Sequence, residues 1–211
     1  SVPLSATFEF DVSALLEAIE ESKPEVVIVC SPNNPTGSSI ADSDLRRLLE
    51  AAPGLVVIDE AYHEFAAHSV VPLLNEFPNL VVLRTFSKAM GLAGMRIGYL
   101  LAAPQLLAEI RKAVLPYNLN VFSQTVAEVA VEMYETELMP LVKRIIVERE
   151  RLFAELGAIE GLRPVASKAN FMIVRTMVEP RQLFRELLAR DILVRDVSGY
   201  PMLKDYFRFS V

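Results

Sequence analysis

The chain has 211 residues, of which 52% are hydrophobic, and this is enough apolar material for one large domain or two modest ones. Its formal net charge of −6 at pH 7, with no basic stripe or arm, argues against nucleic acid as a partner. Its longest apolar runs, VVIVC and LVVI, are too short to cross a bilayer, and the segment SVPLSATFEF lacks the regions of a secretory leader.

Cysteine and histidine content limits the chemistry further. The single cysteine, Cys30, cannot form an internal disulfide, which favours a reducing, cytoplasmic location. Its apolar neighbours favour a buried structural thiol over a nucleophile. The two histidines, His63 and His68, have no cysteine nearby, so no metal site is predicted.

The first half of the chain alternates helical patterns with short apolar runs. Apolar spacing predicts a helix over 13–22, and good capping residues precede a second helix over 42–52. Continuous apolar runs predict strands at 25–30, 55–58 and 79–84. This alternation is typical of an α/β fold with a mostly parallel sheet covered by helices on both faces.

Each predicted strand ends in a polar loop of unusual composition. The loops read SPNNPTG (31–37), DEAY (59–62) and TFSKAMGLAGMRIG (85–98). In open α/β sheets, ligands bind outside the carboxyl ends of the strands. We therefore expect the three loops to converge on one site.

The second half of the chain has a different pattern. A mostly helical segment is predicted over about 123–156, and its ERERL stretch (148–152) is interpreted as a solvated helix face. Beyond it the pattern indicates a small α+β domain, with a strand at 170–175, a helix at 179–190, and strands at 192–197 and 206–211. We assign the chain to part of a large domain, a helical connection and an incomplete small domain, at 1–120, 121–156 and 157–211.

Five side chains in the loops suggest a particular chemistry. Asp59 closes an apolar strand, where a carboxylate is costly without a partner. Lys88 lies in a loop of small residues, and a lysine held in a cleft can lose its proton and attack a carbonyl. Thr85, Ser87 and Arg96 offer the hydroxyl and guanidinium donors that hold a phosphate. Pyridoxal phosphate (PLP), a phosphorylated aldehyde with a basic ring nitrogen, would use all five.

Each of these signals has an ordinary structural explanation when taken alone. An aspartate at a strand end is commonly a cap, and NNPTG contains the residues that turns require. An arginine in a short strand of a small domain often lies on the solvent face. The order and combination of the motifs carry the prediction.

Three motifs together resemble the class I and II aminotransferases, enzymes of PLP fold type I. They are NNPTG (33–37), DEAY (59–62) and SKAMGLAGMRIGY (87–99), each at the end of a predicted strand. Four further stretches narrow the resemblance toward the histidinol-phosphate aminotransferases: CSPNNPTG, PYNLN, ANFMIVR and ILVRDVSGYP. The similarity extends over essentially the whole chain, and it implies the fold-type-I architecture with PLP as cofactor.

The resemblance also implies roles for the loop residues. Lys88 matches the lysine that bonds the cofactor and then transfers the substrate proton. Asp59 matches the carboxylate paired with the pyridine nitrogen, and Tyr62 and Asn34 match groups that contact the cofactor's phenolic oxygen. Asn34 is also expected near the substrate carboxylate. Three further residues match ligands of the cofactor phosphate, namely Thr85, Ser87 and Arg96.

Substrate contacts are implied farther along the chain. Arg208 in YFRFSV matches the arginine that clamps the substrate α-carboxylate. Arg195 in ILVRD matches the arginine that contacts the phosphate of histidinol phosphate. Tyr117 in PYNLN is a candidate for the substrate pocket, and a turn at a domain boundary is the competing interpretation.

The family pattern is longer than this chain. Members extend upstream with the glycine-rich phosphate cup and the residue that stacks on the pyridine ring, and they continue beyond FRFSV. We therefore expect a piece truncated at both ends, with sheet edges and apolar surface left uncovered. The resemblance also implies a homodimer with active sites at the subunit interface.

The leading functional prediction is a PLP-dependent transamination of L-histidinol phosphate with 2-oxoglutarate. Two enzyme alternatives are a threonine-phosphate decarboxylase-like activity and an aromatic amino-acid aminotransferase. The non-enzyme alternatives are an effector-binding module of the same fold and an inactive fragment. Cofactor absorbance and product analysis separate these possibilities.

Overall fold

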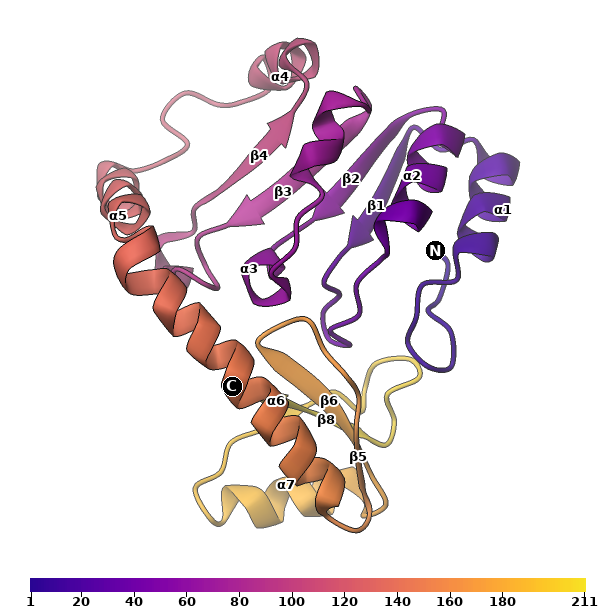
Figure 1. Ribbon diagram of the computed structural model, residues 1–211, viewed down its shortest axis with the longest axis vertical. Helices are drawn as coiled ribbons and strands as arrows, with labels where there is room; N and C mark the ends of the chain where they lie inside the picture. Colours follow the sequence, from indigo (N-terminus) through magenta and orange to yellow (C-terminus); the bar gives the residue numbers. More distant parts are fainter.

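The computed structural model describes residues 1–211 and contains two β-sheets joined by a long helical segment (Figure 1). The first sheet comprises, in spatial order, β1 (Val26–Cys30), β2 (Leu55–Asp59), β3 (Leu80–Thr85) and β4 (Gly98–Ala102). β1, β2 and β3 are parallel, and β4 pairs antiparallel with β3. The three predicted strands are confirmed within one residue at every end. β4 was not predicted, because a short apolar run after a glycine-rich loop has no distinctive periodicity.

Helices α1 (Val12–Ser22) and α2 (Asp42–Ala51) are also close to prediction. The Asp11 side chain caps α1 by accepting from the Ala14 amide at 3.0 Å. α2 carries Asp42 and Asp44 in its first turn, where the helix dipole favours negative charge. Three shorter helical segments follow, α3 (His63–Ala66), the 3-10 helix Val71–Asn75 and, after β3, the 3-10 helix Ala93–Met95; α4 (Pro104–Arg111) comes after β4.

The two faces of the first sheet are covered unequally. Its core combines β-strand residues with apolar side chains of α1, α2 and the Val71–Asn75 turn. On the opposite face, Ile28 of β1 is 71% exposed. Val81 of β3, on the same face, is 4% exposed, so the predicted cover on both faces fails at β1 and not across the whole sheet. Both crossovers, β1 to β2 and β2 to β3, advance in the same direction across the sheet, and right-handed crossovers in one direction place their helices on the same side.

The second sheet is antiparallel and has the order β5-β6-β8-β7. Its elements are β5 (Leu162–Pro164), β6 (Phe171–Thr176), α7 (Pro180–Leu188), β7 (Arg195–Asp196) and β8 (Tyr206–Ser210). The predicted strand over 192–197 shrinks to the two residues of β7, because only these pair with β8. The division at residues 120 and 156 stays a prediction.

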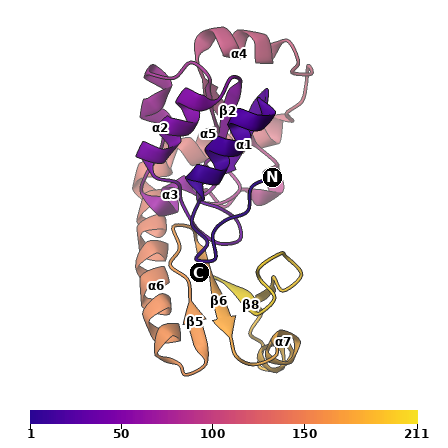
Figure 2. The same cartoon turned by 90° about the vertical axis from the view of Figure 1, so that its right-hand side faces the viewer.

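A nearly continuous helical rod connects the sheets. It consists of α5 (Val121–Glu132), a π-helical turn over Tyr134–Leu138 and α6 (Met139–Ala158). Pro140 in the first turn of α6 cannot donate a backbone hydrogen bond, which suits a break in the α-helical ladder at this point. In both views α6 runs beside the second sheet, and it packs against β5, β6 and, in the first half of the chain, α3 (Figures 1 and 2). No helix in the chain is long and apolar enough to span a bilayer.

The ERERL stretch of α6 is only partly a solvated face. Arg151 is exposed and pairs with Glu148 and Glu155 of the same helix. Arg149 is 5% exposed and points between the sheets. Two residues correspond to about 200° around a helix, so neighbouring arginines in this pattern face opposite sides.

Candidate active site

The predicted convergence of the three strand-end loops is confirmed. A cavity of about 400 Å³ lies where the loops face the second sheet. The loops after β1, β2 and β3 each contribute to its lining, and the rest comes from the segment around β7 and from β8. Its lining residues are Asn34, Pro35, Tyr62, Lys88, Arg195, Asp196, Val197, Tyr200 and Arg208.

Polar side chains from both halves of the chain meet in this cavity. Arg208 Nη1 donates to Asn34 Oδ1 at 2.9 Å, and Asn34 Nδ2 donates to Tyr62 Oη at 3.4 Å. The Arg208 guanidinium also stacks on Phe171 of β6, 4.8 Å from the ring centroid. Arg208 Nε is buried and has no hydrogen-bond partner in the chain.

Lys88 stands beside the aromatic wall of the cavity. Its Nζ lies 5.4 Å from the centroid of the Tyr62 ring, and it forms no ion pair with any carboxylate of the chain. Tyr62 is itself held edge-on against Phe171, with ring centroids 5.1 Å apart. An amine on an anchored wall, with Arg195 and Arg208 lining the same cavity, suits a small anionic carbonyl compound.

Asp59 ends β2 beside this cavity without lining it. It is half-buried, and its Oδ1 accepts from the Ala61 amide at 3.0 Å. It has no cationic partner in the chain, so its carboxylate can serve a ligand that carries a proton or a positive charge.

The three predicted phosphate ligands lie at the end of β3 or after it, and they do not line the cavity. Thr85 Oγ1 accepts from the Ser87 amide at 3.1 Å and donates to the Ile97 carbonyl at 3.4 Å. Arg96 is exposed, adopts a left-handed backbone (φ 52°), and donates to the Ala93 carbonyl. Tyr117 is 100% exposed and also lies outside the cavity lining.

Several contributors to the site were not predicted. Tyr200 and Asp196 line the cavity, and Phe171 supports both Tyr62 and Arg208. Their only signal in the sequence is that they fall inside ILVRDVSGYP and ANFMIVR, the stretches that carried the family resemblance. Nothing in the local pattern indicates which of those side chains face the cavity.

A buried ion pair ties together the ends of two strands that carry site residues. Glu60, which follows Asp59, is 2% exposed and accepts from Arg84 Nε at 3.0 Å and Nη2 at 2.9 Å. Its other oxygen accepts from the Val70 amide. Burial alone lowers the pKa of the Arg84 guanidinium, but hydrogen bonds with Tyr99 and Glu60 outweigh this effect and the pKa is raised.

Replacing Glu60 with glutamine should therefore destabilise the fold. Loss of charge-assisted hydrogen bonds at a buried site should lower the free energy of unfolding by about 2 kcal/mol, measured by urea denaturation. Glu76→Gln is the matched control, because Glu76 pairs with Arg46 at the surface and should cost less than about 1 kcal/mol. Equal losses in the two variants would contradict the structural importance of the buried pair.

The pKa of the Cys30 thiol depends on the charge of Asp59, so the reactivity of Cys30 can be used to test that charge. Burial raises the pKa of the Cys30 thiol, and the neighbouring Asp59 carboxylate raises it further. We expect iodoacetamide to alkylate Cys30 at pH 8 more slowly in the folded protein than in the urea-unfolded chain. Asp59→Asn should accelerate the reaction of the folded protein, because the thiolate then forms without a neighbouring negative charge. An unchanged rate would show that Asp59 does not act on Cys30.

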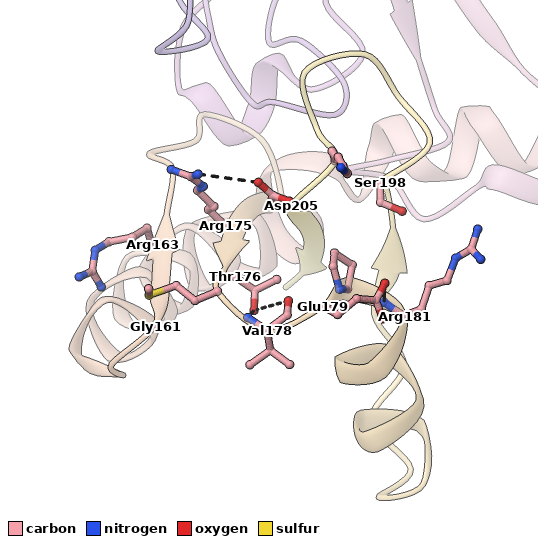
Figure 3. A pocket seen from close by; sticks show the side chains of 12 residues that line it. Gly161, Arg163, Arg175, Thr176, Val178, Glu179, Arg181, Ser198 and Asp205 are labelled. Carbon is pink, nitrogen blue, oxygen red and sulfur yellow. Dashed lines mark hydrogen bonds and ion pairs between the residues drawn. The ribbon is translucent and has the colours of Figure 1, made fainter.

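The chain also has a larger hollow, of about 900 Å³, on the second sheet (Figure 3). It lies between β5, β6 and α7 and contains Arg163, Arg175 and Arg181 among its lining residues. Arg175 pairs with Asp205 there, at 3.7 Å. None of the predicted site residues lines it, so size alone does not identify the reactive cavity.

Comparison with known proteins decides the family. Residues 1–211 match the family described as aminotransferase class I and II. The chain belongs to this family. The histidinol-phosphate aminotransferase of Chlorobium phaeovibrioides is 42% identical to it over 211 residues. The aligned region covers 100% of the chain and 58% of that relative, so the chain spans less than two thirds of the protein it matches.

Solved structures of other aminotransferases share the fold. The histidinol-phosphate aminotransferase of Clostridium acetobutylicum superposes with a TM-score of 0.89 at 26% identity, covering 99% of this chain and 64% of its own. That of Sinorhizobium meliloti, solved in complex with pyridoxal-5'-phosphate, gives 0.85 at 29% identity, covering 100% and 59%. These superpositions confirm the predicted fold-type-I α/β architecture.

Proposed function

We propose that this aminotransferase chain binds PLP and transaminates L-histidinol phosphate, with 2-oxoglutarate as the amino acceptor. The products are imidazole acetol phosphate and L-glutamate, and the reaction is a step of histidine biosynthesis. One observation carries the proposal: the cavity brings the Lys88 amine together with the Arg195 and Arg208 guanidinium groups. The 42% identity to a histidinol-phosphate aminotransferase supports the choice of substrate.

The residues of the site fit PLP. The amine of Lys88 and the carboxylate of Asp59 are both without ion-pair partners, at the carboxyl ends of adjacent strands. Lys88 would bond the cofactor, Asp59 would pair with its ring nitrogen, and Tyr62 and Asn34 would hold its phenolic oxygen. The phosphate would be held by Thr85, Ser87 and Arg96. When bound, PLP supplies an aldehyde that condenses with amines and a ring that accepts electrons.

The chain's own residues then position the substrate and move its proton. Lys88 Nζ receives the proton from the α-carbon of the amino donor and returns a proton to the α-carbon of the 2-oxo acid. Tyr62 and Asn34 keep the wall beside Lys88 in place through their hydrogen bond. Because Lys88 is held in the cavity beside the substrate, the proton transfer does not depend on a collision of separate molecules in solution.

Two arginines suit the two different substrates. Glutamate and 2-oxoglutarate carry an α-carboxylate, which pairs with the Arg208 fork. Histidinol phosphate carries a phosphate ester in that region, with its phosphorus two atoms farther from the α-carbon than a carboxyl carbon is, and we assign this group to Arg195. We also expect a homodimer that acts on small molecules.

Product analysis tests the proposal. The purified protein, as the full natural chain that contains these 211 residues, is incubated with PLP, L-histidinol phosphate and 2-oxoglutarate, and L-glutamate is measured. We expect glutamate formation without release of carbon dioxide, and weaker activity with phenylalanine or tyrosine as donor. Release of carbon dioxide from threonine phosphate would point to decarboxylation, and cofactor binding without turnover of any donor would overturn the enzyme assignment.

An Arg195→Gln variant tests whether Arg195 binds the phosphate of histidinol phosphate. The variant should use histidinol phosphate with a raised KM, while its reaction with glutamate stays close to that of the unmodified protein. A matched change at exposed Arg190, which pairs with Glu186 on the protein surface, should alter neither. Equal losses for both substrates in Arg195→Gln would contradict the phosphate role.

A further inference from the structure

Arg149 is the one buried arginine of α6, and it bridges the two halves of the chain. Its Nη1 donates to the Phe65 carbonyl at 3.0 Å and to the Ala169 carbonyl at 3.1 Å. Phe65 belongs to α3, which follows the first-sheet strand β2, and Ala169 belongs to the segment that leads into β6 of the second sheet. Nε and Nη2 donate to Glu150 Oε1 at 2.9 and 2.7 Å, which fixes the plane of the guanidinium.

Each of the two carbonyl groups belongs to a segment that supports one side of the cavity, either the side with Tyr62 or the side with Arg208. The Phe65 amide donates to the Tyr62 carbonyl at 3.1 Å, so α3 holds the backbone of Tyr62. Ala169 precedes Phe171, on which the Arg208 guanidinium stacks. Arg149 therefore fastens the Tyr62 wall and the Arg208 wall to the same helix.

The contacts within the site depend on the distance between the Tyr62 wall and the Arg208 wall. The bond from Arg208 to Asn34 joins residues 174 positions apart and crosses from the second sheet to the first. The edge-on contact of Tyr62 with Phe171 crosses the same boundary. A shift of either wall by about 1 Å would break such contacts, and misplacement of that size is known to cost enzymes about 100-fold in rate.

We propose that Arg149 is a positioning residue, whose guanidinium sets the distance between the Lys88–Tyr62 wall and the Arg208 wall of the cavity. The proposal rests on the proposed aminotransferase function for its kinetic consequences, but its structural consequence is independent. A planar guanidinium can donate hydrogen bonds to two carbonyl groups and a carboxylate at once, whereas the ammonium group of a lysine cannot reproduce that geometry. A methionine fills similar space without any donor.

The test compares Arg149→Lys and Arg149→Met with the matched variants of Arg151. Arg151 lies two residues away on the same helix, but it is exposed and bonded only to Glu148 and Glu155. Kinetics are measured per cofactor-loaded subunit of the full natural chain. We expect Arg149→Lys to raise the KM values for the amino donor and the 2-oxo acid together, on the order of 10-fold. Arg195, assigned to the phosphate of the donor, and Arg208, assigned to the carboxylate of the 2-oxo acid, are paired on adjacent strands and belong to the same wall. The cofactor absorbance should not change, and the Arg151 variants should match the unmodified protein.

A distance measurement tests the same idea without activity. Spin labels at Glu50→Cys on α2 and Gln182→Cys on α7, in a Cys30→Ala background, report the separation of the two halves. We expect a narrow distance distribution that broadens in Arg149→Met and stays narrow in Arg151→Met.

The outcomes separate this inference from the proposed function. If the Arg149 variants lose thermal stability but keep unchanged KM values and an unchanged distance distribution, Arg149 is only a structural residue and the inference is wrong. If the unmodified protein transaminates no donor, the proposed function fails. The distance distribution then still decides whether Arg149 sets the spacing of the walls.

Discussion

Replacing Lys88 with alanine should abolish transamination. Lys88 Nζ is the only amine that lines the cavity, and no other group there can both bond an aldehyde and transfer the α-proton. Loss of a general base alone costs about 100-fold to 10,000-fold, so we expect kcat to fall by at least about 1,000-fold. Glutamate release from histidinol phosphate and 2-oxoglutarate, measured per protein subunit, checks this value.

The absorbance of added PLP gives a second measurement on the same variant. The unmodified protein should shift the cofactor's absorbance through a covalent bond that survives gel filtration, and Lys88→Ala should not. Lys143→Ala is the matched control, because Lys143 is an exposed lysine on α6 outside the cavity. A covalent cofactor band that persists in Lys88→Ala would show that another lysine is the nucleophile.

Replacing Arg208 with lysine should produce the second largest loss. The arginine lines the cavity, donates to Asn34 with one nitrogen and stacks on Phe171, so its guanidinium is held in place in the cavity wall. A carboxylate bound by the fork receives two parallel hydrogen bonds, and each charge-assisted bond is worth about 1.5–3 kcal/mol. Lysine offers only a point charge. We expect kcat/KM for glutamate to fall on the order of 100-fold.

The matched control for this variant lies on the neighbouring strand. Arg175 of β6 is exposed and pairs loosely with Asp205, so Arg175→Lys should leave the kinetics unchanged. Titration with a dicarboxylate inhibitor separates binding from turnover in both variants. If Arg208→Lys binds the dicarboxylate as tightly as the unmodified protein does, Arg208 is not the carboxylate clamp.

The sequence by itself determined the local elements and the loops that follow them. Continuous apolar runs predicted β1, β2 and β3, because a strand buried in a parallel sheet must be apolar along its length. The parallel arrangement then required that the loops with Asn34, Tyr62 and Lys88 open at one edge. Motif identity at those loops was sufficient to predict the family.

Only the tertiary structure decided how the second half of the chain completes the site. Arg208 reaches Asn34 across 174 positions, and no local periodicity encodes a contact over that separation. The same limit explains why the exposure of Ile28 and the short β7 were not predicted, since both depend on which elements pack together. The positions of Thr85, Ser87 and Arg96 outside the cavity lining also depend on how the elements pack together, which local patterns do not encode.

The ERERL stretch shows this limit in a single helix turn. Its alternating charges predict a solvated face, and Arg151 has that role. Arg149 differs from Arg151 only in the direction it faces. Because α6 packs against α3 and against the second sheet, a side chain that points between them is buried. Composition and periodicity fix which residues form the helix, whereas burial of one guanidinium and exposure of the other depend on packing between elements far apart in the chain.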